Sequence, residues 1–221
     1  MTSSVEPGPD GHVAWRRAVL TSAAHAQAAS AGLAKPGTSL VLLGTRAGPA
    51  IDVTHVQTGS AVVIDGRPYL IDCGYGTLRQ LVASNVGYLD LSTMFFTHLH
   101  DDHTADVPAL LSFQWTNGKT TNTDAYGPYG TARLIAAAVA VIHGNVEIRT
   151  ADEGRTTDAD AQFHGHDVVA ADEPVQVFKD DRVTVTAIEN THYPGTLQGK
   201  NGAPEYRVAP GLQGSLDRVL R

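Results

Sequence analysis

The chain has 221 residues, of which 42% are hydrophobic and 18% charged, a composition that indicates a folded core and excludes a largely disordered chain. Its formal net charge of -7 provides no basic surface for non-specific nucleic-acid binding, so a nucleic-acid substrate would need metal ions and local basic residues. The single cysteine, Cys73, excludes an intrachain disulfide and a cysteine-based zinc site.

The N-terminal segment, residues 1–38, mixes Gly, Pro, Ser and Ala without a sustained period, and we expect it to lie outside the core. Arg16 and Arg17, followed by a short apolar stretch and the small residues Ala24 and Ala26, resemble a twin-arginine export signal. The apolar stretch is short for such a signal, so we expect a cytoplasmic protein and keep export as the alternative. No apolar run reaches about 18 residues, which predicts no membrane span and no membrane partner.

The first half of the chain predicts strands, one hairpin and one helix. We expect strands over residues 39–45, 60–64 and 68–71, the last two joined by a turn at Asp65-Gly66-Arg67, because Gly tolerates a positive φ. Residues 76–83 read as a helix whose buried side carries Leu78, Leu81 and Val82. Gly44 and Gly74 are expected to allow close approach of backbone near the site described next.

Metal-ligand side chains gather in residues 91–105, which read LSTMFFTHLHDDHTA. An apolar strand ends at Thr97 and is followed at once by His98, His100, Asp102 and His103. Imidazole nitrogen and carboxylate oxygen are ligands that Zn²⁺ accepts. Because alternate residues after a strand can project to one side, His98 and His100 can bind one ion, and Asp102 and His103 can serve a second. We therefore predict one or two ions, zinc first and Mn²⁺ or iron as alternatives, that activate water for hydrolysis.

The second half predicts a helix over residues 105–115 that begins beside the metals, a strand end at 125–128 and a helix over 131–142. The apolar stripe of the latter helix comprises Leu134, Ile135, Ala138 and Val141. Residues 151–173 are acidic and read as a solvated loop, so His164 and His166 are expected on a surface loop. Residues 174–178 and 182–188 form a second hairpin that ends close to His192. This alternation of strands and helices predicts a layered α/β fold.

The segment THLHDDH at residues 97–103 resembles the signature of the metallo-β-lactamase fold superfamily. The GT and GP pairs at 44–49, LIDCG at 70–74, AYGP at 125–128, and THYP and EYR at 191–207 are most similar to its ribonuclease Z and arylsulfatase-like branch. The resemblance covers residues 39–208 and implies one domain with an αββα sandwich.

The same resemblance implies roles for individual residues. His98, His100 and His192 would hold one ion, and Asp102 and His103 would belong to the second, with Asp102 also orienting or deprotonating the attacking water. Asp72 matches an aspartate that hydrogen-bonds a ligand histidine and fixes its tautomer. Judged from the residues alone, Asp72 could equally cap the turn at Gly74.

One departure from the family pattern lies at the C-terminus. Members of this branch continue after the YR segment with further strands, an SGDT turn that supplies a bridging aspartate, and a final histidine. Residues 209–221 contain neither and read as a helix-like tail around Asp217. We therefore expect a truncated domain in which the second half of the sandwich is incomplete.

These observations predict a metal-dependent hydrolase that cleaves an ester-type bond, a phosphodiester or a sulfate ester, in a small molecule or a nucleic acid. The alternative is an inactive or single-metal remnant of such a hydrolase, whose unpaired sheet edge would favour a homodimer or aggregation. A β-lactam or lactone hydrolase would use the same metals and differ only in its substrate contacts.

Overall fold

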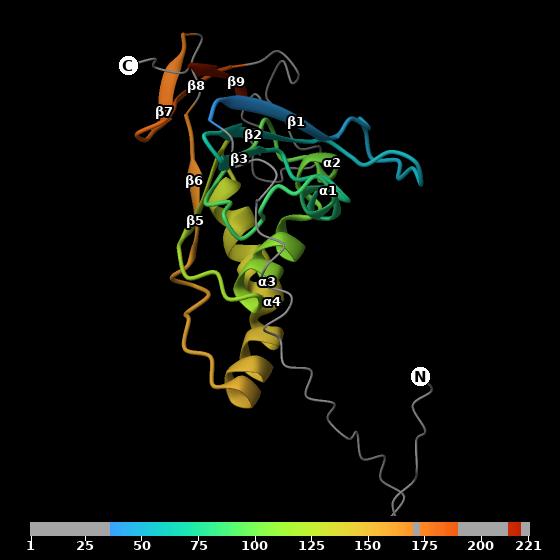
Figure 1. Cartoon of the computed structure of the whole chain (residues 1–221), viewed down its shortest axis with the longest axis vertical. Coiled ribbons are helices and arrows are strands. Elements are labelled where there is room, and N and C mark those ends of the chain that lie inside the picture. Colours follow the sequence, from blue (N-terminus) through green and yellow to red (C-terminus); the bar gives the residue numbers. More distant parts are fainter. Residues whose placement is uncertain (1–35, 170–172, 190–211, 218–221) are drawn as a thin grey trace, which may run out of the picture.

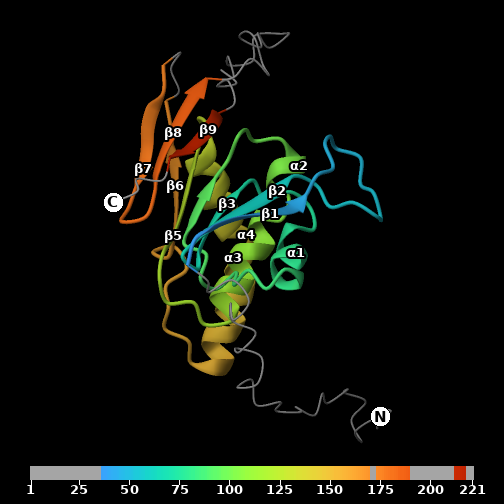
Figure 2. The same cartoon turned by 45° about the horizontal axis from the view of Figure 1, so that its top comes forward.

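The computed structural model describes residues 36–169, 173–189 and 212–217. These residues form a six-stranded sheet and a three-stranded sheet. Helices α1 (Thr77–Ala83), α3 (Val107–Thr116) and α4 (Thr131–Glu153) cover one face of the larger sheet, and the smaller sheet packs on the other face (Figures 1 and 2). The predicted layered α/β architecture is confirmed for the part of the chain that the structure describes.

The larger sheet has the strand order β1-β2-β3-β4-β5-β6. Its strands are β1 (Thr38–Gly44), β2 (Gly59–Ile64), β3 (Arg67–Ile71), β4 (Thr93–Phe95), β5 (Thr123–Gly127) and β6 (Phe163–Asp167). The first three strands are antiparallel, and β3 to β6 run parallel to one another. In the predicted hairpin turn, Asp65 and Gly66 have φ angles of 48° and 85°, the backbone that a two-residue type I′ turn requires.

The strand that precedes the histidine motif, β4, lies in the middle of this sheet. All three of its residues are buried, and β3 and β5 flank it in parallel. Parallel strands place their carboxyl ends at the same edge of a sheet, where the loops after the strands meet. Asp72 after β3 and the motif after β4 are therefore brought together by the sheet itself.

Two predicted helices differ from the observed ones. The helix expected over residues 105–115 is found as α3, and an additional short helix, α2 (Asp101–Thr104), precedes it, so the motif itself is partly helical. Helix α4 continues to Glu153, where Gly154 ends it with a left-handed φ of 66°, the usual backbone of a helix C-terminus. The helix continues past residue 142 because Val146 also packs against the core.

Two apolar side chains expected on buried helix faces are exposed. Val141 is 72% and Val82 is 52% exposed. In α4 the buried stripe follows Ile135, Val139 and Ile142, a spacing of four and then three residues that repeats the helical period more closely than Val141 does.

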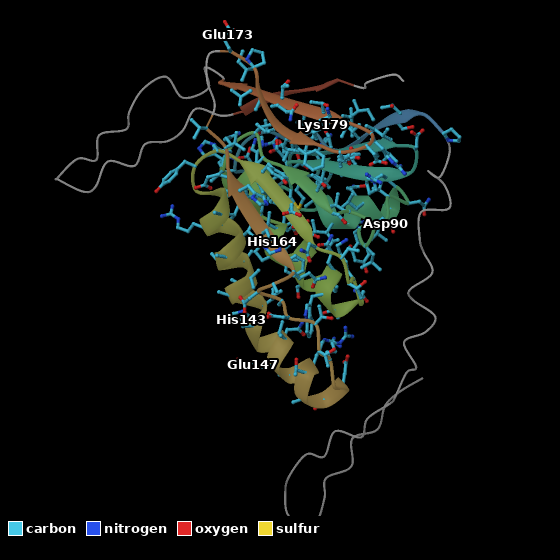
Figure 3. The ribbon with its side chains drawn as sticks, turned by 90° about the vertical axis from the view of Figure 1, so that its left-hand side faces the viewer. Asp90, His143, Glu147, His164, Glu173 and Lys179 are labelled. Atoms are coloured by element: carbon cyan, nitrogen blue, oxygen red, sulfur yellow. The ribbon has the colours of Figure 1, made fainter. Side chains whose placement is uncertain are left out.

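The acidic segment 151–173 is not a continuous loop, and this prediction was wrong. It contains the end of α4 and the whole of β6, which pairs in parallel with β5. His164 lies on β6 beside α4 (Figure 3), and Nε2 of His166 lies 2.7 Å from Oδ1 of Asp124. Backbone pairing with β5 stabilises this strand although its sequence is polar, so charge composition did not reveal it.

The smaller sheet consists of β7 (Val175–Lys179), β8 (Thr184–Glu189) and β9 (Leu212–Asp217) in that order. The predicted second hairpin is confirmed as the antiparallel pair of β7 and β8. The tail was expected to be helix-like, but its described part, Leu212–Asp217, forms a strand antiparallel to β8. His192 and the EYR segment at 205–207 lie outside the described residues, as does the arginine-containing leader.

Helix α4 also has the length and mean hydropathy, 1.3, of a membrane-crossing helix. One of its faces packs against α3 and β6 in the core through Ile135, Ala138, Val139 and Ile142. The predicted lack of a membrane partner stays a prediction.

The two sheets are joined by a polar network at the edge of a small apolar core. The hydroxyl of Tyr69 on β3 donates to Asp180 at 2.6 Å, and Arg67 binds Asp180 and Asp181 at 2.9 Å and 2.6 Å. Arg182 donates to the backbone carbonyls of Ile64 and Asp65. Burial, followed by the hydrogen bond and negative charge of Asp180, raises the pKa of Tyr69, so the phenol stays protonated and can donate.

We expect Tyr69→Phe to lower the free energy of unfolding by about 1–2 kcal/mol, because it removes one of the hydrogen bonds that the Asp180 carboxylate accepts. Tyr129→Phe is the matched control, since Tyr129 is 68% exposed and should change stability by less than about 0.5 kcal/mol. Urea denaturation of both variants provides the comparison, and equal midpoints would contradict a role for this hydrogen bond.

Candidate metal centre

The motif histidines that follow β4 lie next to one another. The ring centroid of His98 is 3.9 Å from that of His103 and 4.8 Å from that of His100. His98 is buried, His103 is partly buried, and His100 is exposed. The structure therefore brings these three predicted ligands into one cluster that reaches from the core to the surface.

Asp72 fixes one side of this cluster. Its carboxylate is buried, and it lies 2.8 Å from Nδ1 of His103 and 2.8 Å from both the backbone nitrogen and the hydroxyl of Thr97. The backbone of Asp72 is left-handed, with a φ of 59°, a conformation that Asp adopts more readily than most residues. The contact with a predicted ligand histidine is therefore present, while the tautomer-fixing role stays a prediction.

The electrostatics of His103 follow from two carboxylates. Burial lowers the pKa of His103, but the hydrogen bond and negative charge of Asp72, together with Asp102, outweigh burial and raise the pKa above its ordinary value. Nε2 of His103 lies 3.6 Å from Oδ2 of Asp102. The imidazole is thus held between Asp72 on one nitrogen and Asp102 near the other.

Asp102 is held from the opposite side by the loop after β1. The backbone N–H of Gly48 donates to Oδ2 of Asp102 at 2.6 Å. The side chain of Gln57 donates to the Gly48 carbonyl at 3.1 Å and accepts from the backbone N–H of Tyr75 at 3.2 Å. Gln57 is 4% exposed, so it ties this loop to the turn after β3 and sets where Gly48 meets Asp102.

The close backbone approach expected at two glycines is confirmed. A Cβ at Gly74 would lie 2.1 Å from the carbonyl oxygen of Asp102, and one at Gly44 would lie 1.8 Å from that of Gln57. Both distances are far shorter than any van der Waals contact. Only a residue without Cβ lets the loop and the motif pack this closely.

The donor set is chemically suited to zinc or a similar ion, since it consists of imidazoles and a buried carboxylate. Within residues 36–169, 173–189 and 212–217, however, no three His, Cys, Asp or Glu side chains converge as a preformed metal site. His192, the expected third ligand of the first ion, lies outside these residues. The residues present fit a metal centre by the chemistry of their donor atoms, and its complete ligand set stays a prediction.

Two contributors were not found by sequence reasoning. Thr97 precedes the motif and contacts Asp72, His98 and His103, whereas Gln57 lies in a loop that carries no recognisable pattern. A cavity of about 740 Å³ lies between residues 51–56, α1 and α3. None of the four motif side chains lines it, so it is separate from the candidate centre.

The described part of the chain has a metallo-β-lactamase-like fold, with a histidine-rich turn after a central parallel strand, helices on one face of the sheet and a second sheet on the other. The short form of human tRNase Z has a similar fold, with a TM-score of 0.54 at 19% identity over 81% of this chain and 64% of that chain. The expected fold is thus confirmed.

Sequence comparison identifies ribonuclease Z homologues. Ribonuclease Z of Mycobacterium avium (strain 104) is 35% identical over 115 residues, which are 51% of this chain and 41% of that protein. Ribonuclease Z of Mycobacterium sp. (strain KMS) is 31% identical over 160 residues, 70% of this chain and 53% of that protein. The family model described as "Anti-Pycsar protein Apyc1" matches residues 38–126. The chain spans about half the length of these curated relatives.

We expect Gln57→Leu to speed hydrogen exchange of the Gly48 amide about tenfold or more, because it removes both side-chain hydrogen bonds of Gln57, and a loss of roughly 1.4 kcal/mol in local stability gives tenfold faster exchange. Gln176→Leu on the exposed surface of β7 is the matched control. Amide exchange followed by NMR measures both variants. An unchanged Gly48 rate in Gln57→Leu would show that another contact positions the loop.

Proposed function

We propose that this chain is a metal-dependent hydrolase that cleaves phosphodiester bonds. The proposal rests on one observation, the cluster of His98, His100, His103 and the buried Asp102 at the carboxyl ends of β3 and β4. It is supported by the similarity to proteins named ribonuclease Z. Because the chain spans about half of those proteins, their activity comes to it only as a proposal.

In this proposal His98, His100 and His192 would hold one ion, and Asp102 and His103 would hold a second. Zinc is the first choice, with Mn²⁺ or iron as alternatives. A bound ion of this kind lowers the pKa of a coordinated water to about 7 and stabilises negative charge that develops on a phosphoryl oxygen.

Two side chains of the chain itself have roles in this proposal: Asp72 orients a candidate ligand, and Asp102 accepts a proton from water. Asp72 holds His103 through Nδ1, which keeps the ring in place. Asp102 is held by Gly48 through Oδ2, which limits the rotation of its carboxylate. A carboxylate fixed in this way can accept the proton of the attacking water as a general base.

The class of substrate is an ester of a phosphoryl group, in a small molecule or a nucleic acid. The net charge of -7 repels a polyanion over most of the surface, so binding of a nucleic acid would depend on the metal ions and on local basic residues. A sulfate ester would present a similar tetrahedral group and is a test substrate rather than a second proposal. A homodimer and a cytoplasmic location also remain proposals.

We expect His98→Ala to lower phosphodiesterase activity at least about 100-fold and to remove zinc from its site, since one of three ligands of the ion is lost. His143→Ala is the control, because His143 lies on α4 (Figure 3) and its Nε2 is 3.1 Å from Oδ1 of Asp160, which is not a candidate ligand. Activity on bis(p-nitrophenyl) phosphate and zinc content by mass spectrometry are measured together. Full activity after chelation or in His98→Ala would contradict the proposal.

We further expect hydrolysis of bis(p-nitrophenyl) phosphate to exceed that of p-nitrophenyl sulfate and of a chromogenic β-lactam by at least about tenfold in kcat/KM. The same metal-loaded chain is used with all three substrates. A preference for the sulfate ester or the β-lactam would overturn the assignment of the substrate while leaving metal-dependent hydrolysis in place.

A further inference from the structure

The hydroxyl of Thr97 contacts three residues of the candidate metal centre without being one of its expected ligands. Its oxygen is 2.8 Å and 3.1 Å from the two carboxylate oxygens of Asp72. It also lies 3.1 Å from Nδ1 of His98 and 3.3 Å from Nδ1 of His103. One hydroxyl thus connects a buried carboxylate with two neighbouring imidazoles.

The available protons determine which atom is the donor in each of these hydrogen bonds. A carboxylate only accepts hydrogen bonds, and a threonine hydroxyl has one proton to give and two lone pairs to accept with. The hydroxyl of Thr97 therefore donates to Asp72. Having no second proton, it can only accept from the imidazoles, so Nδ1 of His98 must carry the hydrogen of that contact.

Nδ1 of His103 also carries a hydrogen, but its hydrogen-bond partner is a different residue. Its Nδ1 lies 2.8 Å from Oδ2 of Asp72, and the carboxylate again can only accept. Nδ1 of His103 therefore carries a hydrogen that Asp72 fixes directly, with Thr97 as a weaker second acceptor at 3.3 Å. His98, by contrast, obtains this constraint from Thr97.

A hydrogen on Nδ1 makes Nε2 the basic nitrogen of a neutral imidazole, and only a basic nitrogen can bind a metal ion. We propose that Thr97 is a positioning residue that holds His98 in the Nδ1–H tautomer and thereby directs Nε2 of His98 to the metal. This inference rests on the proposed metal centre for its purpose, although the tautomer itself exists without a metal.

The local structure suits Thr97 to this task. Its backbone N–H donates to Oδ1 of Asp72 at 2.8 Å, so the residue is attached to Asp72 by both main chain and side chain. A β-branched side chain has few χ1 rotamers, which keeps the hydroxyl directed at the carboxylate. Serine keeps the hydroxyl with less restriction, and valine keeps the shape without the hydroxyl.

The experiment compares Thr97→Val and Thr97→Ser in the full chain without metal, labelled with ¹⁵N in histidine. Long-range ¹H–¹⁵N spectra at a pH where the imidazoles are neutral distinguish the two tautomers. We expect His98 to be the Nδ1–H tautomer in the unmodified chain and in Thr97→Ser, and to shift toward Nε2–H in Thr97→Val. His103 is an internal control, because Asp72 still holds its Nδ1 in every variant.

Zinc binding gives the second measurement. We expect Thr97→Val to weaken binding of Zn²⁺ by about 10–100-fold, the usual effect of removing a hydrogen-bond partner of a metal ligand, and Thr97→Ser to restore it to within about threefold. An Nε2–H tautomer of His98 in the unmodified chain would overturn the inference, as would an unchanged His98 tautomer in folded Thr97→Val.

The unmodified chain supplies a decisive spectrum even if Thr97→Val fails to fold. Failure of the proposed function and failure of the inference about Thr97 can be distinguished, because the tautomer is measured without metal. If the unmodified chain binds no zinc, the proposed function fails while the inference about Thr97 and His98 is still decided by the spectra.

Discussion

The candidate centre depends on a carboxylate buried at the end of β3. An isolated carboxylate in a protein interior costs several kcal/mol, so its position must be stabilised by hydrogen bonds. Asp72 receives three, from the backbone and hydroxyl of Thr97 and from His103. The same bonds that stabilise Asp72 determine the placement of the residues after β4. The same hydrogen bonds therefore stabilise the fold and orient the candidate ligands.

A second constraint acts from the loop after β1. Gln57 belongs to that loop and connects it by hydrogen bonds to the turn after β3, and the backbone N–H of Gly48 in the same loop donates to the carboxylate of Asp102. Gly74 allows the turn to approach the backbone of Asp102 without a steric clash. Asp72 and Gly48 thus hold the motif from two sides, so that His103 and Asp102 are positioned by different parts of the chain. Such support from surrounding residues is what keeps ligands ready for an ion.

Several elements could be predicted from the sequence because their signals are local. The hairpin around Gly66 and the apolar strand before His98 were correctly located, since turn chemistry and short apolar runs act within a few residues. Strand β6 and the short helix α2 could not be found in this way. The polar segment around His164 becomes a strand only because β5 offers it backbone partners. The motif around Asp102 becomes helical in a turn that other loops hold in place.

The sequence by itself determined that imidazoles and carboxylates are concentrated after a buried strand, and therefore which chemistry the chain can support. It also determined where glycine is needed, although not which atoms approach it. Only the tertiary structure decided that His103 is the histidine that Asp72 contacts, that Thr97 contacts two imidazoles, and that Gly48 donates to Asp102. The reason is that a hydrogen bond forms only when donor and acceptor are placed to within a few tenths of an ångström, and many of these partners are remote in the chain. Those distances are set by the pairing of β3 with β4 and by loop packing, which no local pattern encodes.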